Sequence, residues 1–366
     1  MLLGNPMKKE ILLLITIIFL FFLTFEIVLR VIDYPTYGFQ ARMFKYDEDL
    51  GYKISENYSG KHSIFGRNVD VKTNSKGMRD FREYNYEKEN KTRILILGDS
   101  YTFGNGVELN ESYAEILRKK FNEDIEIINF GVPGYGLNQE AVYFLEEGKK
   151  YFPDIILIQF TPNDFGDYKI IKENDSFYVN KITIADNEGF LISGSGKDKG
   201  IHGLHVYFLK KIRVYGFIYQ KSRAILSPII NRYLKSNVPG YFLEKNSETY
   251  KKYLEIYQEN LKIIKENTNA KIFFFAGPSR DDFATSEEIK KEYSLDYETN
   301  TSQIYGDLNK IAESLNISFI KINFSDLNLF IKIDGHWTPE GNKIIAESIY
   351  ENLKNNFINN SFFQKK

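Results

Sequence analysis

Residues 93–104 read RILILGDSYTFG, and this stretch predicts a buried β-strand that passes directly into a helix. The apolar run from Ile94 to Leu97 has the length of a strand and stops at Gly98. Ser100 follows at the corner, where its hydroxyl faces the crevice outside the carboxyl end of the strand, the place where α/β sheets hold ligands. The position suits a helix cap and also a catalytic nucleophile, and the rest of the chain has to separate the two.

Length and composition indicate a folded protein with a sizeable core. The chain has 366 residues, of which 43% are hydrophobic, and its formal net charge is −1. This near-neutral balance gives no reason to expect nucleic acid as a partner, because duplex-binding domains carry a strong basic excess. Cysteine is absent, which excludes disulfides, thiolate metal sites and a cysteine nucleophile.

The N-terminal segment predicts a membrane anchor. After two lysines, an apolar run covers residues 11–25 and resumes after Glu26, which is about the length that crosses the hydrocarbon core of a bilayer. A cleaved signal peptide and a buried core helix are the alternatives, but residues 26–37 offer no small-x-small cleavage site. The lysines favour a cytoplasmic N-terminus, so we expect an uncleaved single-pass anchor with the rest of the chain outside the cytoplasm. Glu26 and Arg30 are spaced to pair on one helix face.

Beyond the anchor, apolar strands alternate with amphipathic helices. Near-continuous apolar strands separated by helices are typical of a parallel sheet covered on both faces, and polar corners that follow such strands gather at one edge. The expected strands are 94–97, 125–130, 154–160, 271–276 and 318–323. The expected helices are 112–121, 138–147, 248–267, 301–315 and 338–357.

Two corners supply candidate donors for an oxyanion. Acyl transfer needs a nucleophile, a base and donors aimed at the developing oxyanion, and backbone N–H groups or an asparagine amide can provide these donors. Gly134, in the turn after the second strand, has no side chain that blocks access to its N–H. Asn163 follows the third strand and carries an amide. A turn role for Gly134 and a helix-cap or Asx-turn role for Asn163 are the structural alternatives.

The expected base lies far downstream of Ser100. His336 stands on the loop before the last helix, two residues after Asp334. This arrangement suits a histidine whose second nitrogen is held by a carboxylate while the first takes a proton from a serine hydroxyl. A lone histidine in such a place is often structural, but its coupling to the Ser100 corner favours catalysis.

Taken in chain order, these blocks resemble the SGNH/GDSL hydrolases, a family of esterases and acyl-modifying enzymes, over roughly residues 93–357. The resemblance implies an α/β fold, a three-layer α/β/α sandwich with a five-stranded parallel sheet of the flavodoxin-like type. It implies that Ser100 is the nucleophile, His336 the general base and acid, and Asp334 the group that orients His336. It also implies an oxyanion hole formed by the backbone N–H groups of Ser100 and Gly134 with the Asn163 side chain.

Two positions depart from the pattern of that family. Thr161 stands where the third block usually has a glycine, two residues before Asn163. Asp334 precedes His336 by two residues rather than three, and Ile333 occupies the usual place. The shorter spacing resembles that of membrane-associated alginate O-acetyltransferase-like members of the superfamily, and it leaves open which acid orients His336.

The chain is expected to fall into an anchor, a prelude, a main domain and a tail. The prelude is a strand-and-loop segment that packs on the main domain, holds no obvious chemistry and carries one loop histidine, His62, with a surface or hydrogen-bonding role. The bounds are 1–32 for the N-terminal tip and anchor, 33–91 for the prelude, 92–357 for the hydrolase domain, about 165–247 for an insertion within it, and 358–366 for the tail.

The insertion separates the two halves of the main domain. Its first part, 177–185, alternates and leads into the turn-like residues 186–189, which predicts a hairpin. Its second part, 204–234, is rich in apolar residues and carries lysine and arginine but no acidic residue. We expect helices that pack as a cap on the sandwich, and contact with a membrane surface or an anionic polymer is the alternative.

The sequence therefore predicts a membrane-anchored serine esterase that forms an acyl-enzyme on Ser100. The expected substrates are O-acyl esters, acetyl foremost, on a small molecule, a surface glycan or a lipid, and this step rests on the family resemblance. Two alternatives stay open, an O-acyltransferase that passes the acyl group to a polysaccharide hydroxyl and a non-catalytic glycan-binding protein on the same fold. We expect no cofactor and no metal, because His202 and His205, spaced like two ligands, lack a third.

Overall fold

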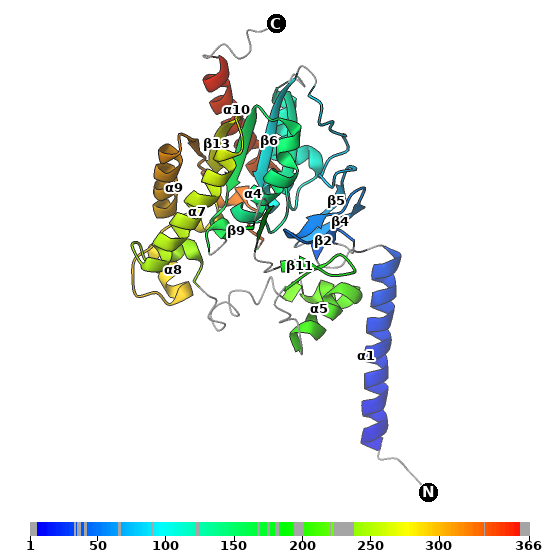
Figure 1. Cartoon of the computed structure of the whole chain (residues 1–366). Coiled ribbons are helices and arrows are strands. Elements are labelled where there is room, and N and C mark those ends of the chain that lie inside the picture. The colour runs from blue at the N-terminus through cyan, green and yellow to red at the C-terminus, as the bar shows by residue number, and fades with distance from the viewer. Residues whose placement is uncertain are drawn as a thin grey trace.

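The computed structural model describes most of the chain, and Figure 1 shows a domain of sheet and helices from which one long N-terminal helix extends. That helix is α1 (Pro6–Val31). The described residues are 6–32, 34, 38–39, 42–64, 67–88, 91–121, 125–166, 169–173, 176–179, 183–193, 201–219, 221–222, 238–332 and 334–358.

Five strands form the central sheet of the domain. They are β6 (Thr92–Gly98), β7 (Ile125–Gly131), β8 (Ile155–Phe160), β13 (Lys271–Ala276) and β14 (Ser318–Lys321). Their order across the sheet is β14-β13-β8-β6-β7, and all neighbouring pairs are parallel. The inner strands are buried on both faces, which is why they read as nearly continuous apolar runs in the sequence. All five predicted strands are confirmed.

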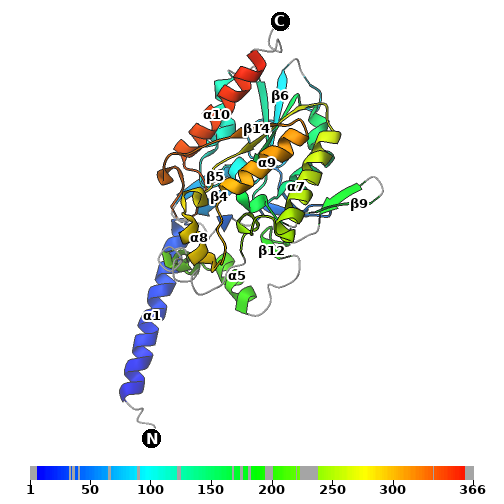
Figure 2. The ribbon, with the colours of Figure 1, turned by 90° about the vertical axis from the view of Figure 1, so that its left-hand side faces the viewer.

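Helices cover both faces of this sheet, as Figures 1 and 2 show. They are α3 (Tyr113–Lys120), α4 (Leu137–Glu146), α7 (Glu248–Glu266), α9 (Ser302–Ser314) and α10 (Pro339–Ile358), with α8 (Ser286–Tyr293) lying lower in the domain. Along β6, Ile94 and Ile96 enter the hydrophobic cluster that α3 and α10 share, whereas Leu95 and Leu97 enter the cluster that α4, α7 and α9 share. This alternation produces the three-layer α/β/α sandwich that the family resemblance implies.

Two small antiparallel units precede the sheet. In the first, β1 (Gly38–Phe39), β4 (Ser59–Ile64) and β5 (Arg67–Lys72) pair in the order β1-β4-β5. In the second, β2 (Phe44–Asp47) and β3 (Gly51–Ile54) form a hairpin. These strands give residues 38–72 the strand-and-loop character that the sequence predicts for the prelude.

His62 does not lie on a loop, so this part of the sequence interpretation is wrong. It belongs to β4 and is only 3% exposed. Burial lowers the pKa of His62 well below the usual value for histidine, and the nearby charges of His336 and Arg79 act in the same direction. The strand was missed because its sequence, SGKHSI, is mostly polar and lacks the apolar alternation that marks a half-buried strand.

The insertion begins with two hairpins rather than the single hairpin predicted. β9 (Ile170–Glu173) pairs with β10 (Ser176–Val179), and β11 (Thr183–Ala185) pairs with β12 (Leu191–Ser193) across the predicted turn at 186–189. The helix α5 (Ile201–Lys211) follows, and residues 213–219 are also helical. The rest of the predicted basic segment 204–234, namely residue 220 and residues 223–234, lies outside the described residues.

α1 carries an apolar surface that the rest of the described chain leaves exposed except at its last turns, where Leu29 is only 3% exposed. Lys9–Val31 is long and apolar enough, by length and composition, to cross a membrane, and none of its apolar window is buried in the protein. The predicted pairing of Glu26 with Arg30 is confirmed, since an N···O distance of 2.8 Å joins the two side chains.

Candidate active site

β6 delivers Ser100 to the carboxyl edge of the sheet. The strand ends two positions earlier, and Ser100 is the first residue of the short helix α2 (Ser100–Phe103). Asp99 caps this helix, because its Oδ1 accepts a hydrogen bond of 2.9 Å from the backbone N–H of Tyr101. α2 lies so close to β7 that a Cβ on Gly131 would come within 2.4 Å of a backbone nitrogen of α2. Glycine at this position therefore lets the turn that carries the candidate nucleophile Ser100 (residues 99–103, the nucleophile turn) rest directly on the sheet edge.

His336 meets Ser100 although the two are 236 positions apart. Its Nε2 lies 2.8 Å from Ser100 Oγ. On the other side of the ring, Nδ1 is hydrogen-bonded to Asp334 Oδ2, and the same oxygen accepts a bond of 3.3 Å from the His336 backbone N–H. Gly335, between them, has a left-handed φ of +91°. This turn brings a carboxylate only two residues away against the ring nitrogen that faces away from Ser100.

Tyr101, in α2, contacts the loop that carries Gly335 and His336 (the histidine loop). Its ring packs on the ring of His336 with centroids 4.6 Å apart, and its hydroxyl donates to the carbonyl of Gly335 at 3.1 Å. The same ring lies 4.7 Å from the buried ring of Trp337. Sequence reasoning missed Tyr101, although its place directly after Ser100 is a signal that could have been used.

The loop after β7 runs beside the nucleophile turn. The N–H of Val132 donates to the carbonyl of Gly98 at 3.1 Å, which ties this loop to the end of β6. Gly134 has a left-handed φ of +82°, and an added Cβ would lie 2.8 Å from the hydroxyl of Tyr52. That hydroxyl donates to the carbonyl of Pro133 at 2.9 Å. Both the conformation and the lack of space therefore require glycine at position 134.

The turn after β8 lies next to Asp99. It is a 3₁₀ turn, η3 (Pro162–Asp164), that contains Asn163, whose side chain lies outside the described part of the structure. Thr161 Oγ1 lies 3.1 Å from Asp99 Oδ2 and 3.3 Å from Asp164 Oδ2. Thr161 thus joins the backbone that carries Asn163 to the cap of the nucleophile helix. A glycine at position 161 would lack this hydrogen bond.

Three carboxyl groups are buried beneath this edge of the sheet. Asp99, Asp164 and Glu140 are each no more than 2% exposed. Both oxygens of Glu140 and Oδ1 of Asp164 have no hydrogen-bond partner among the described residues. Burial raises the pKa of Glu140 and of Asp164 well above the usual carboxyl values, and the neighbouring carboxylates add to the effect. Glu140 and Asp164 therefore resist ionisation.

The prelude supports the nucleophile turn, a contact that sequence reasoning missed. Arg79 is 2% exposed, and its guanidinium donates to the carbonyls of Phe103, Gly104 and Val107 at 3.1, 2.6 and 2.8 Å. The first two of these carbonyls belong to the C-terminal end of α2, where a helix leaves carbonyls unpaired. Burial lowers the pKa of Arg79 to about 10, so the group remains charged at neutral pH. A single arginine in a loop gives no sequence signal for such a contact.

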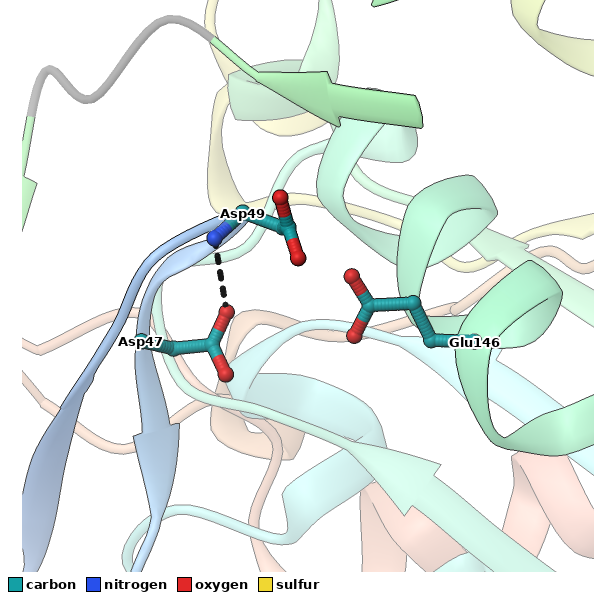
Figure 3. Close-up of side chains that lie close together, drawn as sticks. All are labelled: Asp47, Asp49 and Glu146. Carbon is teal, nitrogen blue, oxygen red and sulfur yellow. Dashed lines mark hydrogen bonds between the residues drawn. The ribbon is translucent and has the colours of Figure 1, made fainter. Parts of the chain in front are cut away.

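A separate acidic cluster lies on the β2–β3 hairpin and α4. Figure 3 shows Asp47, Asp49 and Glu146 close together, at a spacing that could hold a metal ion. However, Lys53 Nζ lies 2.8 Å from Asp47 Oδ2 and 2.7 Å from Glu146 Oε2. The ammonium group already supplies positive charge to the cluster. Its contacts are therefore those of a structural ion-pair network that joins the hairpin to α4.

The site brings together a serine, a histidine and a carboxylate in the arrangement that acyl transfer by a serine nucleophile uses. A serine hydroxyl lies within hydrogen-bond distance of an imidazole, and a carboxylate holds the opposite nitrogen of that imidazole. Two loops with a glycine and an asparagine adjoin the nucleophile turn through the contacts of Val132 and Thr161. Such an arrangement can attack a carbonyl carbon and transfer a proton to the leaving oxygen.

Comparison with known proteins identifies one family. The family model described as GDSL-like Lipase/Acylhydrolase matches residues 94–349. No curated protein sequence matches the chain. Among solved structures, the lipase/acylhydrolase from Enterococcus faecalis is 13% identical, with 72% of this chain and 96% of that chain covered and a TM-score of 0.38. The acetyl xylan esterase AlAXEase is 11% identical, with 71% of this chain and 99% of that chain covered and a TM-score of 0.39. A family two carbohydrate esterase from Clostridium thermocellum is 15% identical, with 74% of this chain and 66% of that chain covered and a TM-score of 0.38.

Proposed function

Because the chain belongs to the GDSL-like lipase/acylhydrolase family and is therefore an ester-bond hydrolase, we propose that it cleaves O-acyl esters through an acyl-enzyme on Ser100. The observation that carries this proposal is the 2.8 Å contact of Ser100 Oγ with His336 Nε2, with Asp334 on the opposite nitrogen. The acyl group is a short one, acetyl foremost, and the alcohol part belongs to a glycan or a lipid.

The reaction proceeds in two halves. In the first, His336 Nε2 takes the proton of Ser100 as Oγ attacks the carbonyl carbon of the ester. The bond from that carbon to the alcohol oxygen breaks, and the alcohol leaves with the proton from His336. In the second, water gives a proton to His336 while its oxygen attacks the acyl carbon, and Ser100 leaves and recovers the proton. Asp334 keeps the imidazole oriented and stabilises its positive charge in both halves.

The developing oxyanion is stabilised by the backbone N–H groups of Ser100 and Gly134 and by the amide of Asn163. In support, the Ser100 N–H is among the first donors of α2, and hydrogen bonds hold the loops of the other two residues against β6 and Asp99. Removal of one such donor costs an acyl-transfer enzyme about 3–4 kcal/mol in the barrier.

α1 anchors the enzyme to a membrane in this proposal. The exposed side chains of Lys9–Val31 support it, because an apolar surface of this length is stable in a bilayer and prone to association in water. The lysines before the span favour a cytoplasmic N-terminus, and in this proposal the catalytic domain lies on the other side of the membrane.

The experiment that tests the function uses the full chain in detergent, p-nitrophenyl acetate as substrate and a fluorophosphonate label. Ser100→Ala is expected to abolish labelling and to lower kcat by more than 1,000-fold. Ser314→Ala is the control, because Ser314 is an exposed serine at the end of α9 whose hydroxyl donates to the Ile311 carbonyl and accepts from the Gln258 amide of α7, contacts that involve no residue of the site. Labelling that survives Ser100→Ala would refute the proposal. Transfer of acetyl to an added sugar in preference to water would instead assign the chain as an acyltransferase.

A further inference from the structure

We infer that α5 and the helical residues 213–219 form a platform on the bilayer surface, and that this platform presents the catalytic edge to esters carried by molecules embedded in the same membrane. The inference rests on the proposed function and names its substrate class, an acyl ester on a lipid-embedded alcohol. It follows from the contacts of the insertion with α1, from the apolar side chains that the insertion exposes, and from the contacts that connect the insertion to the loop of Gly134.

The insertion packs against the last turns of the apolar helix. The N–H of Val214 donates to Glu26 Oε2 at 2.8 Å. Arg213 Nη1 donates to the carbonyl of Leu29 at 3.0 Å. The rings of Phe25 and Phe217 meet edge to face, with centroids 5.4 Å apart. These contacts fix the insertion helices at the level where the membrane span ends.

At this level the insertion exposes apolar side chains. Leu204 and Tyr207 are 53% and 54% exposed and lie three positions apart, on one face of α5. Ile218, in the second helical segment, is 45% exposed. A contact of 2.7 Å between His205 Nδ1 and the Tyr215 hydroxyl joins the two segments, so these side chains belong to one unit.

The charge of the segment suits an anionic lipid surface. In the described residues 204–219 and 221–222 the charged residues are lysine and arginine only, and the exposed Lys221 lies at the end of the second helical segment. Exposed apolar side chains beside basic ones are typical of helices that lie in the headgroup region of a bilayer. Their position next to the end of α1 identifies the bilayer as the surface that covers them.

The catalytic edge lies at the end of the domain that faces α1. In both Figure 1 and Figure 2 the C-terminal end of α10 lies at the end of the domain away from α1. α10 has 20 residues and so spans about 30 Å. Its first residue, Pro339, therefore lies toward α1, and His336 is three positions before it.

A series of contacts also connects the platform to the loop after β7 that carries Gly134. Lys211 Nζ lies 2.7 Å from Glu188 Oε2, in the turn between β11 and β12. The carbonyl of the next residue, Gly189, accepts from the N–H of Phe44 in β2 at 3.2 Å. Phe44 packs on Tyr52 of β3 with ring centroids 5.5 Å apart, and Tyr52 donates to the carbonyl of Pro133 beside Gly134.

A fluorescence experiment tests the platform without relying on activity. The full chain is reconstituted into vesicles with and without phospholipids that carry bromine near the headgroup, which quenches nearby tryptophan. The only native tryptophan, Trp337, is buried and gives a constant background. Tyr207→Trp should lose at least half of its added emission. Phe152→Trp is the matched control, because Phe152 is 67% exposed and precedes β8 at the opposite edge of the sheet, and its emission should not change. Equal quenching of the two variants, or quenching of neither, overturns the inference.

A kinetic experiment tests the substrate class. The double variant Leu204→Gln/Tyr207→Gln should lower hydrolysis of a vesicle-embedded acetyl ester by about tenfold and leave p-nitrophenyl acetate hydrolysis unchanged. Phe152→Gln should change neither rate. Acetylated phospholipid and acetylated glycolipid, assayed in parallel, identify the alcohol. An equal fall for soluble and embedded esters refutes the platform, whereas absence of Ser100-dependent hydrolysis in the unaltered chain refutes the proposed function and leaves the quenching result to decide the platform.

Discussion

Replacing Gly335 by alanine tests how the histidine loop is held. The φ of +91° at Gly335 lies in a region that costs an L-residue about 1–2 kcal/mol. Among the described residues other than the two chain neighbours of Gly335, nothing lies within 4 Å of an added Cβ, so the expected effect comes from the backbone conformation. The loop is closed by hydrogen bonds from the Ile331 N–H to the His336 carbonyl at 2.7 Å and from the Gly335 N–H to the Ile331 carbonyl at 3.0 Å.

Relief of this strain by a change in φ at Gly335 moves the adjacent His336. A backbone that relaxes toward negative φ shifts the imidazole, and a displacement of about 1 Å lowers the rate by about 100-fold. Strain that is not relieved lowers the free energy of unfolding by about 1–2 kcal/mol, which corresponds to a fall in Tm of about 2–4 °C. We therefore expect kcat for p-nitrophenyl acetate to fall by about 10- to 100-fold, together with a lower Tm.

The assay combines steady-state kinetics with thermal unfolding followed by circular dichroism. Gly306→Ala is the matched control, because Gly306 lies inside α9 and no described residue outside the backbone of that helix lies within 4 Å of an added Cβ. Alanine at this helical position should leave kcat unchanged and raise the free energy of unfolding by about 0.5–1 kcal/mol. A Gly335→Ala protein with the kcat and Tm of the unaltered chain would refute the reasoning that the left-handed turn positions His336.

Three further changes test other contacts of the site. Asp334→Asn should lower kcat by about 1,000- to 10,000-fold in the same assay, because an amide cannot stabilise the imidazolium, and a loss of less than tenfold would contradict an orienting role. Tyr52→Phe removes the hydrogen bond to the Pro133 carbonyl and should lower the free energy of unfolding by about 1 kcal/mol in a urea titration, with an unchanged midpoint as the contrary result. Burial raises the pKa of Glu140 above its ordinary 4.5, so the stability that its protonated form contributes is fully present below pH 4.5 and is lost as pH rises toward the folded-state pKa. Glu140→Gln should thus match the unaltered chain near pH 4.5 and become increasingly more stable toward pH 8, whereas a difference independent of pH would argue against a buried, protonated Glu140.

The central sheet was predictable because of how its strands are buried. β6 and β8 lie between two helical layers, so each appears in the sequence as a run of isoleucine and leucine with sharp polar ends. The ends of parallel strands meet at one edge, and this rule alone placed Ser100, Gly134 and Asn163 in neighbouring loops. Of these expectations, the contact of Ser100 with His336 joins the residues that lie farthest apart in the sequence, 236 positions.

The parts that could not be predicted depend on contacts between distant segments. Tyr52 and Arg79 belong to irregular or short elements, and nothing in their sequence neighbourhood indicates that they reach loops of the main domain. β4 was missed because two of its three buried positions, His62 and Ser63, carry polar side chains, which the apolar alternation rule ignores. The short spacing of Asp334 and His336 depends on a positive φ at Gly335, and a glycine in a sequence does not reveal the sign of its φ.

The support that Arg79 gives to α2 has a practical consequence for shortening the chain. The family match begins at residue 94, yet Arg79 and Tyr52 come before it. A fragment trimmed to residue 94 would lose the guanidinium that pairs with the Phe103 and Gly104 carbonyls and the phenol that braces the loop of Gly134. A soluble fragment for crystallisation or screening should therefore begin no later than residue 42, which retains both side chains together with the β2–β3 hairpin.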